Sequence, residues 1–428
     1  MPWPGRSRRP RNPTDLRVTL RKGHPVNHQR LILSTSILAL ASALTGCTQD
    51  IGSDESYETW NQKNNPAFVD PNFEYNVDRL PLAGKAAQDP IPADYWATYR
   101  DSINQRWDGT DSLSPSEKYA KAFGREGLTD VISAKYGIDK HSSRKECFAD
   151  LDCDDLEDGS TCARRDQTDE MGICIPTWWG LCHGWAPYAI SEPAAVEPAE
   201  HNGVTFYPGD IEALFSLVYT SSLPVKFLSE RCNEKSPDPD DEGRIPQDEC
   251  RDMNPGSLHI VVTNMLGLRE IGFVEDRTYD IQVWNQPVAA YRIINAVDDK
   301  LLEISKEEAV ALLGLEEGSA YTYNPEARRF FHVELELDYI TESPPAHFSN
   351  VGDSTFTRTD TYQYVLEAKA DGEVFGGEYI GSSRTFHPDF VWWPTDKPYG
   401  RVADGMITYD EVKMLNELAQ PSEPEPTD

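Results

Sequence analysis

Cysteine pairing constrains this chain more than any other feature, because disulfides tie distant segments together and one thiol is left over. The eight cysteines are Cys47, Cys147, Cys153, Cys162, Cys174, Cys182, Cys232 and Cys250. The four within residues 147–174 are predicted to pair among themselves, in any of three connectivities. Cys232 and Cys250 bracket a polar loop that a disulfide would close. Since Cys47 is assigned to a lipid below, Cys182 remains unpaired.

The unpaired Cys182 needs a reason, because a free thiol in an exported protein is open to oxidation and disulfide exchange. One explanation is nucleophilic catalysis, which uses the thiolate form. The other is a buried structural cysteine, since three tryptophans surround it in the run WWGLCHGW at 178–185. Both explanations stay open at this point.

The N-terminal region predicts export. Residues 31–45 form an apolar stretch of signal-peptide length, too short to cross a bilayer comfortably. It ends in LTGC, which fits the bacterial lipobox and makes Cys47 the lipid-carrying N-terminus of the mature protein. An ordinary cleaved signal peptide is the alternative, and translation starting near Val26 would give the conventional layout. We therefore expect a lipoprotein of the bacterial outer membrane or cell surface, held to the membrane by its lipid.

Charge narrows the set of partners. Residues 1–47 hold eight Lys or Arg and one acid, so the rest of the chain carries 32 basic and 71 acidic residues, a formal −39. A surface this acidic repels nucleic acid and anionic headgroups, so we expect no nucleic-acid partner. Cations and basic proteins remain suitable partners, although solubility alone also explains such a composition.

The pattern along the chain predicts an α+β protein. The predicted parts are a lipoprotein signal (1–47), a disordered tether (48–90), an N-terminal helical segment (91–146), an acidic four-cysteine segment (147–175), a catalytic core (176–300), a β-rich C-terminal part (301–412) and an acidic tail (413–428). A helix should start at Ser114, with Pro115 at its first position and Glu117 completing a capping box. Residues 258–264, 272–276, 281–284, 329–339 and 362–368 are predicted strands, the last followed by an Asp-Gly turn.

The four-cysteine segment is too poor in large apolar residues to build a core, so its disulfides must hold it together. Its acids Asp150, Asp152 and Asp154 are weak candidates for Ca²⁺ ligands. The spacing does not match a full EF-hand loop, and a solvated acidic surface explains the same residues. We expect no required cofactor and leave calcium open.

A nucleophilic cysteine needs a helix N-terminus, a histidine base and a group that orients the histidine. Gly180 and Leu181 permit a tight turn into a helix that starts at Cys182. His183 would point about 100° away from Cys182 on that helix, so His259 is the predicted base. Asp276 follows on the next predicted strand, where antiparallel pairing would place it beside His259. This order, Cys then His then Asp, is that of a papain-like core.

Several stretches resemble the transglutaminase elicitor family. They include VWNQPV at 283–288, WWGLCHGWAP around Cys182, LSPSEKYAKAFG at 113–124, NPGSLHIVVTN around His259, FVEDRT around Asp276, and GGEY with HPDFVW between 376 and 392. The similarity covers about 90 to 395, and the four-cysteine segment departs from it. The resemblance implies a papain-like, transglutaminase-like fold with Cys182 as nucleophile, His259 as base and Asp276 as its orienting group.

The resemblance also implies the reaction, in which Cys182 attacks a protein-bound glutamine and the resulting thioester is transferred to a lysine or small amine. Trp178 or Trp179 would help bind the oxyanion, and Trp284 would help wall the substrate path, although tryptophans in a core are equally expected. Two rival functions remain, a surface papain-like cysteine protease and a non-enzymatic surface recognition protein. The protease hypothesis lacks the glutamine that is expected upstream of the catalytic cysteine, since this position is Pro176.

Overall fold

The computed structural model describes residues 60, 63–166, 168–235, 237–239, 245, 247–251, 253–278, 280–314 and 324–421. The predicted signal segment with Cys47, the first part of the predicted tether and the last seven residues lie outside this part of the chain. Among the described helices, none has the length and apolarity needed to cross a membrane.

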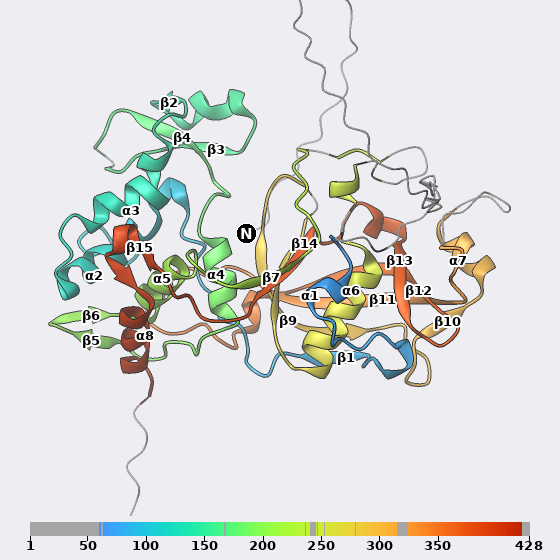
Figure 1. Ribbon diagram of the computed structural model, residues 1–428. Coiled ribbons are helices and arrows are strands. Elements are labelled where there is room, and N and C mark those ends of the chain that lie inside the picture. Colours follow the sequence, from blue (N-terminus) through green and yellow to red (C-terminus); the bar gives the residue numbers. More distant parts are fainter. Residues whose placement is uncertain are drawn as a thin grey trace, which may run out of the picture. The chain divides into compact units, whose positions relative to one another are not determined.

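A curled antiparallel sheet organises the C-terminal half of the described chain (Figure 1). Its main path runs β13-β12-β11-β9-β8-β14-β7, while β1 pairs with β9 and β10 pairs with β11. The strands are β1 (Ala83–Lys85), β7 (Val225–Leu228), β8 (Phe273–Asp276), β9 (Asn285–Ile293), β10 (Leu302–Ile304), β11 (Arg329–Ile340), β12 (Thr357–Ala368), β13 (Val374–Tyr379) and β14 (Phe390–Pro394). β8 and β9, adjacent near the centre of this path, carry the residues discussed below.

Most of the helices pack into two large cores, and α7 (Lys306–Leu312) packs against β11 and β12 in a smaller third one. The first core joins the helical segment before the sheet to the C-terminal helix, and the second fills the space between α6 and the sheet. The helices are α1 (Pro66–Val69), α2 (Pro115–Phe123), α3 (Leu128–Tyr136), α4 (Cys182–Ala189), α5 (Pro208–Val218), α6 (Pro255–Val262), α7 (Lys306–Leu312) and α8 (Tyr409–Leu418), and α6 continues into a π-helical turn, Thr263–Leu268. Short 3₁₀ turns connect many of these elements.

α4 and α6 lie on opposite faces of the sheet. Successive side chains of a strand point to opposite faces. Phe273 of β8 packs in the core shared with α6, whereas the next residue, Val274, packs with Ala186 of α4. β14 repeats this alternation, since Val391 joins the α6 core and Trp392 joins the α4 cluster. This alternation decides which polar side chains can meet.

The four-cysteine segment folds around its disulfides. Cys147 pairs with Cys162 and Cys153 with Cys174, and a third bond joins Cys232 to Cys250. Of the three connectivities open from the sequence, the structure thus has the interleaved one. The segment contains β2 (Glu146–Cys147), β3 (Ser160–Ala163) and β4 (Gly172–Pro176), in the order β2-β4-β3. Two further small sheets pair β5 (Ala199–His201) with β6 (Val204–Phe206), and β15 (Arg401–Val402) with β16 (Ile407–Thr408).

Several predicted elements need correction. Residues 63–90 are not a tether, because α1 and β1 are folded and β1 pairs with β9. Residues 258–264 form a helix and its π-turn rather than a strand, and 281–284 precede β9 instead of forming a strand. The acidic tail begins later than predicted, because α8 reaches Leu418. The predicted capping box at Ser114 is confirmed, with Gly124 ending α2 in the left-handed region.

Candidate active site

Cys182 is the first residue of α4 and the free cysteine of the described chain. The turn before it is tight, because Leu181 donates its N–H to the Tyr95 carbonyl at 2.5 Å and a Cβ on Gly180 would lie 2.4 Å from that same oxygen. The first N–H groups of a helix have no acceptor inside the helix and carry partial positive charge. The thiol therefore lies where a thiolate is favoured by the helix, although only 8 % of the residue is exposed.

The side chain that contacts the sulfur is an amide. Asn285 places Nδ2 3.6 Å from the Cys182 sulfur, and its Oδ1 accepts the Trp392 indole N–H at 2.8 Å. An indole nitrogen only donates, so Trp392 fixes the amide with its oxygen toward the indole and its NH₂ group toward the sulfur. The Val283 carbonyl lies 3.8 Å from the sulfur on the same chain segment. A fixed N–H donor aimed at sulfur stabilises the thiolate.

Burial opposes this stabilisation. Burial raises the pKa of the Cys182 thiol above its ordinary value, the Asn285 amide lowers it, and the nearby carboxyls of Glu342 and Asp276 raise it again. The resting thiol is therefore protonated at neutral pH. A group that can accept its proton is needed before it can act as a nucleophile.

Asp276 lies directly opposite Asn285 in the β8–β9 ladder, so the two side chains share one face of the sheet. Its Oδ1 accepts the backbone N–H of Trp284 at 2.8 Å, while its buried Oδ2 has no hydrogen-bond partner among the described residues. Burial raises the pKa of Asp276 to about 8. A carboxyl group in this state can exchange a proton near neutral pH, which is the property that general acid–base chemistry requires.

The structure does not bring His259 to Cys182. His259 lies on α6, and its Nδ1 is 2.8 Å from the Tyr364 hydroxyl, inside the core on the other face of the sheet. Burial lowers the pKa of His259 to about 3, so its imidazole stays neutral. The expected antiparallel pair of His259 with Asp276 does not form, because the segment that carries His259 is helical.

The tryptophans predicted to serve the site have different surroundings. Trp179 packs between His141 and Arg144, with a ring distance of 4.7 Å to the former and 4.9 Å from the guanidinium carbon of the latter. Trp178 meets Trp179 edge to face at 6.0 Å. Arg144 also donates to the Cys174 carbonyl at 2.7 Å, so the four-cysteine segment helps to hold the residues that lead into Cys182.

Trp284 faces a hollow beside β9. Its ring lies 6.3 Å from that of Tyr95, and it lines a cavity of about 350 Å³ with Gln286, Tyr339 and Glu342. Gln286 donates to the Glu342 carboxylate at 2.9 Å. Because residues 283 and 285 contact the sulfur while 284 and 286 line the cavity, one extended segment separates the two.

The predicted calcium ligands are used by the protein itself. Asp150 accepts from Thr161 and from the Cys162 backbone, and Asp152 accepts two backbone N–H groups, at 2.8 and 3.0 Å. Asp154 is exposed on the same 3₁₀ turn. Within the described chain, the one group of potential ligands close enough for a metal is three cysteines that are already in disulfides. The three aspartates do not converge on a common point.

The sequence predicts no role for Asn285, which the structure places at the sulfur, or for Trp392, which holds its amide. Asn285 lies inside the VWNQPV motif and Trp392 in the HPDFVW stretch, so both belong to stretches that resemble the transglutaminase elicitor family. Neither amide nor indole is a usual proton acceptor, and a search for histidine passes over them.

The comparisons with known proteins agree with this architecture. The model of the family described as "Transglutaminase elicitor" matches residues 63–421. A solved structure, the crystal structure of the GP42 transglutaminase from Phytophthora sojae, is similar to this chain with 35 % sequence identity and a TM-score of 0.72, covering 85 % of this chain and 99 % of the other. A search of curated proteins finds no match.

Proposed function

Because the chain belongs to the transglutaminase elicitor family, we propose that it is an acyltransferase that links protein glutamine side chains to primary amines through a thioester on Cys182. The observation that carries the proposal is the free thiol at the N-terminus of α4 with a fixed amide donor at 3.6 Å. A buried structural cysteine does not need an oriented polar partner.

The proton path runs through Asp276. In its ionised form, Asp276 accepts the thiol proton of Cys182, and the thiolate attacks the carbon of the glutamine γ-carboxamide. The Cys182 backbone N–H, which has no acceptor within its own helix, donates to the oxyanion. Asp276 returns the proton to the amide nitrogen, the C–N bond breaks, and ammonia leaves behind a γ-glutamyl thioester.

Transfer completes the cycle. A neutral primary amine attacks the thioester carbon, Asp276 takes the amine proton, the C–S bond breaks and the sulfur regains a proton. Water in place of the amine gives glutamate, so a partly dry entrance favours transfer. The burial of Cys182, of which only 8 % is exposed, supports such an entrance. In this scheme Asp276 replaces His259, which the sheet separates from the sulfur.

A papain-like core and a lipid anchor at Cys47 are part of the same proposal. Cys182 at a helix start, facing strands that carry Asn285 and Asp276, supports a papain-like core in which a carboxyl takes the place of the usual histidine. The LTGC sequence supports lipid attachment at Cys47, and the three disulfides suit an oxidising compartment.

Amine incorporation tests the function. The full chain is incubated with a glutamine-bearing casein and a fluorescent primary amine, with and without Ca²⁺, beside Cys182→Ala and Asp276→Asn. We expect label with the wild type and none with Cys182→Ala, and a rate that rises with pH toward about 8 as Asp276 ionises. Asp276→Asn should lose this rise.

Three results would replace the proposal. Cleaved casein without label would indicate a protease. Neither label nor cleavage, with a Cys182 that resists alkylation, would indicate a structural thiol in a recognition protein that keeps the fold. Label that survives Cys182→Ala would place the nucleophile elsewhere.

A further inference from the structure

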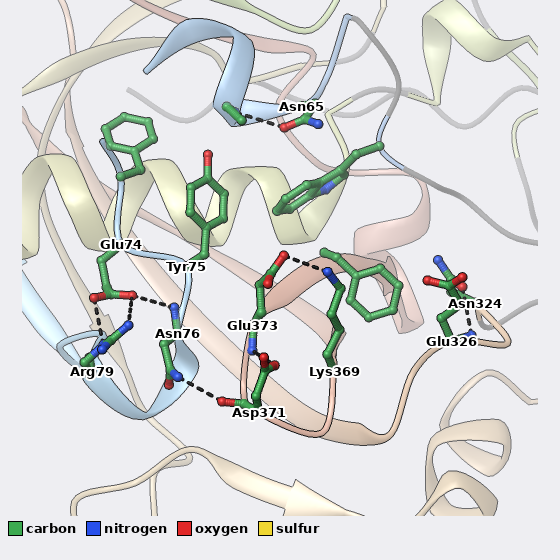
Figure 2. Close-up of a pocket in the computed structure, with 14 residues that line it drawn as sticks. Asn65, Glu74, Tyr75, Asn76, Arg79, Asn324, Glu326, Lys369, Asp371 and Glu373 are labelled. Atoms are coloured by element: carbon green, nitrogen blue, oxygen red, sulfur yellow. Dashed lines mark hydrogen bonds and ion pairs between the residues drawn. The ribbon is translucent and has the colours of Figure 1, made fainter. Parts of the chain in front are cut away.

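A second cavity, of about 670 Å³, lies on the α6 side of the sheet, whereas Cys182 is on the α4 side. Figure 2 shows it between the segment after α1 and the turn that joins β12 to β13. Three partly exposed rings, those of Trp60, Tyr75 and Phe375, line it together with polar side chains from both segments. Its volume falls in the range of small-molecule sites.

The walls of this cavity are fixed by hydrogen bonds between distant segments. Trp60 donates its indole N–H to Asn254 at 3.1 Å and meets Tyr75 at a ring distance of 5.9 Å and an angle of 64°. The Tyr75 carbonyl accepts the Val374 N–H at 2.9 Å. Asn76 donates to the Asp371 carbonyl at 2.9 Å, which joins the two sides. The rings are therefore held in place before any ligand binds.

The charged groups that line the cavity largely satisfy one another. Arg79 pairs with Glu74, and Lys369 pairs with Glu373 at 2.8 Å (Figure 2). The Tyr75 hydroxyl, by contrast, is buried and has no hydrogen-bond partner among the described residues. Because that hydroxyl is out of reach of solvent, the cavity itself offers aromatic faces and ion pairs with spare donor and acceptor positions.

We propose that this cavity binds a neutral oligosaccharide. The C–H faces of a pyranose stack on aromatic rings. Its hydroxyls both donate and accept hydrogen bonds, so they can bond to the carboxylates and to the basic groups of the ion pairs, whereas a charged ligand would be repelled by one of the two. An ammonium ligand would compete with Lys369, whose Nζ already lies 6.0 Å from the Phe375 ring centre and bonds Glu373. An anion would meet four acidic and two basic side chains. The site is independent of the chemistry proposed at Cys182.

Calorimetry on the full chain tests the proposal with defined probes. Cellohexaose, chitohexaose and laminarihexaose are the neutral ligands, and choline and a galacturonate hexamer are the cationic and anionic ones. We expect one neutral hexasaccharide to bind, and Trp60→Ala to weaken it about tenfold while Trp60→Phe keeps most of the affinity. Phe348→Ala, which removes a ring that is 73 % exposed elsewhere, should change nothing.

A second variant covers the case in which Trp60→Ala fails to fold. Ala67 is exposed on α1 and lines the cavity, so Ala67→Trp should block the entrance and abolish binding with an unchanged melting temperature. Cys182→Ala should bind normally. Absence of neutral-sugar binding, preferential binding of choline or galacturonate, or full affinity in Ala67→Trp would each overturn the proposal.

Discussion

The substitution Asn285→Asp probes the contact between amide and sulfur most directly. It keeps the shape of the side chain and its hydrogen bond from Trp392, but it replaces the N–H donor near the sulfur by an oxygen. In the wild type the donor lowers the pKa of a thiol that burial raises. The variant should therefore raise the pKa of Cys182 further.

The size of the effect follows from the geometry. Two unit charges at 3.6 Å interact by about 4–5 kcal/mol at an effective dielectric constant near 20. This repulsion applies while the new carboxyl is ionised. In that state the side chain has no donor, so the hydrogen bond to the charged sulfur is lost as well, at about 1.5–3 kcal/mol. A loss of about 1.4 kcal/mol is tenfold in thiolate population, so we expect at least a tenfold loss at a fixed pH.

Iodoacetamide alkylation of Cys182, followed by mass spectrometry between pH 6 and 10, measures the thiolate without requiring enzymatic activity. Trp392→Phe is the matched control, because it leaves the Asn285 amide in place but free to turn. The alkylation rate of Cys182 in this variant should lie between those of the wild type and Asn285→Asp. Equal alkylation rates for wild type and Asn285→Asp across the whole pH range would refute the role given to the amide. A melting curve of each variant confirms that the fold is kept.

Three further predictions concern stability. Gly184→Ala should lower the unfolding free energy by about 3 kcal/mol, measured by urea titration, because its Cβ would lie 1.9 Å from the Ser216 carbonyl oxygen of α5. The pKa of Asp276 is about 8 in the folded state and near 4 in the unfolded state, so between these values the folded state binds one proton more. The stability should therefore fall as the pH rises from 4 to 8. The melting temperature of Asp276→Asn should fall less over this range. Lys118→Met leaves the buried Asp210 without its cation and should cost about 3–5 kcal/mol by the same titration, whereas adding Asp210→Asn should recover most of it.

Local signals in the sequence were enough where one hydrogen-bonding pattern dominates. The Ser114–Glu117 capping box and Gly124 set both ends of α2, because each uses the chemistry of a residue at a helix end. The disulfide partners were predictable as groups, since exported cysteines this close must pair. Their connectivity was not, because it depends on how β3 and β4 pair in space, where Cys162 and Cys174 lie opposite each other without bonding to each other.

The sequence of α6 predicts a strand for a physical reason. All of its residues are buried, so it has no polar face and no helical period in its hydrophobicity, and its Ile and Val residues favour strands. The available signal was its start, where Asn254 caps the helix and Pro255 takes the first position. The apolar run outweighed this signal, and the error turned His259 into an apparent partner of Asp276.

The identity of the group beside the sulfur depends on the faces of the sheet, which no motif encodes. Asp276 and Asn285 share the α4 face because they are paired residues of β8 and β9, and a shift of one residue in that register would place them on opposite faces of the sheet. The sequence supplies an aspartate, an asparagine and a histidine within thirty residues of one another. Only the register and the helical state of α6 decide that the amide reaches the thiol and the imidazole does not. A chemistry inferred from residue types alone therefore selects the histidine, whereas the packing of β8 and β9 against α4 selects the carboxyl and the amide.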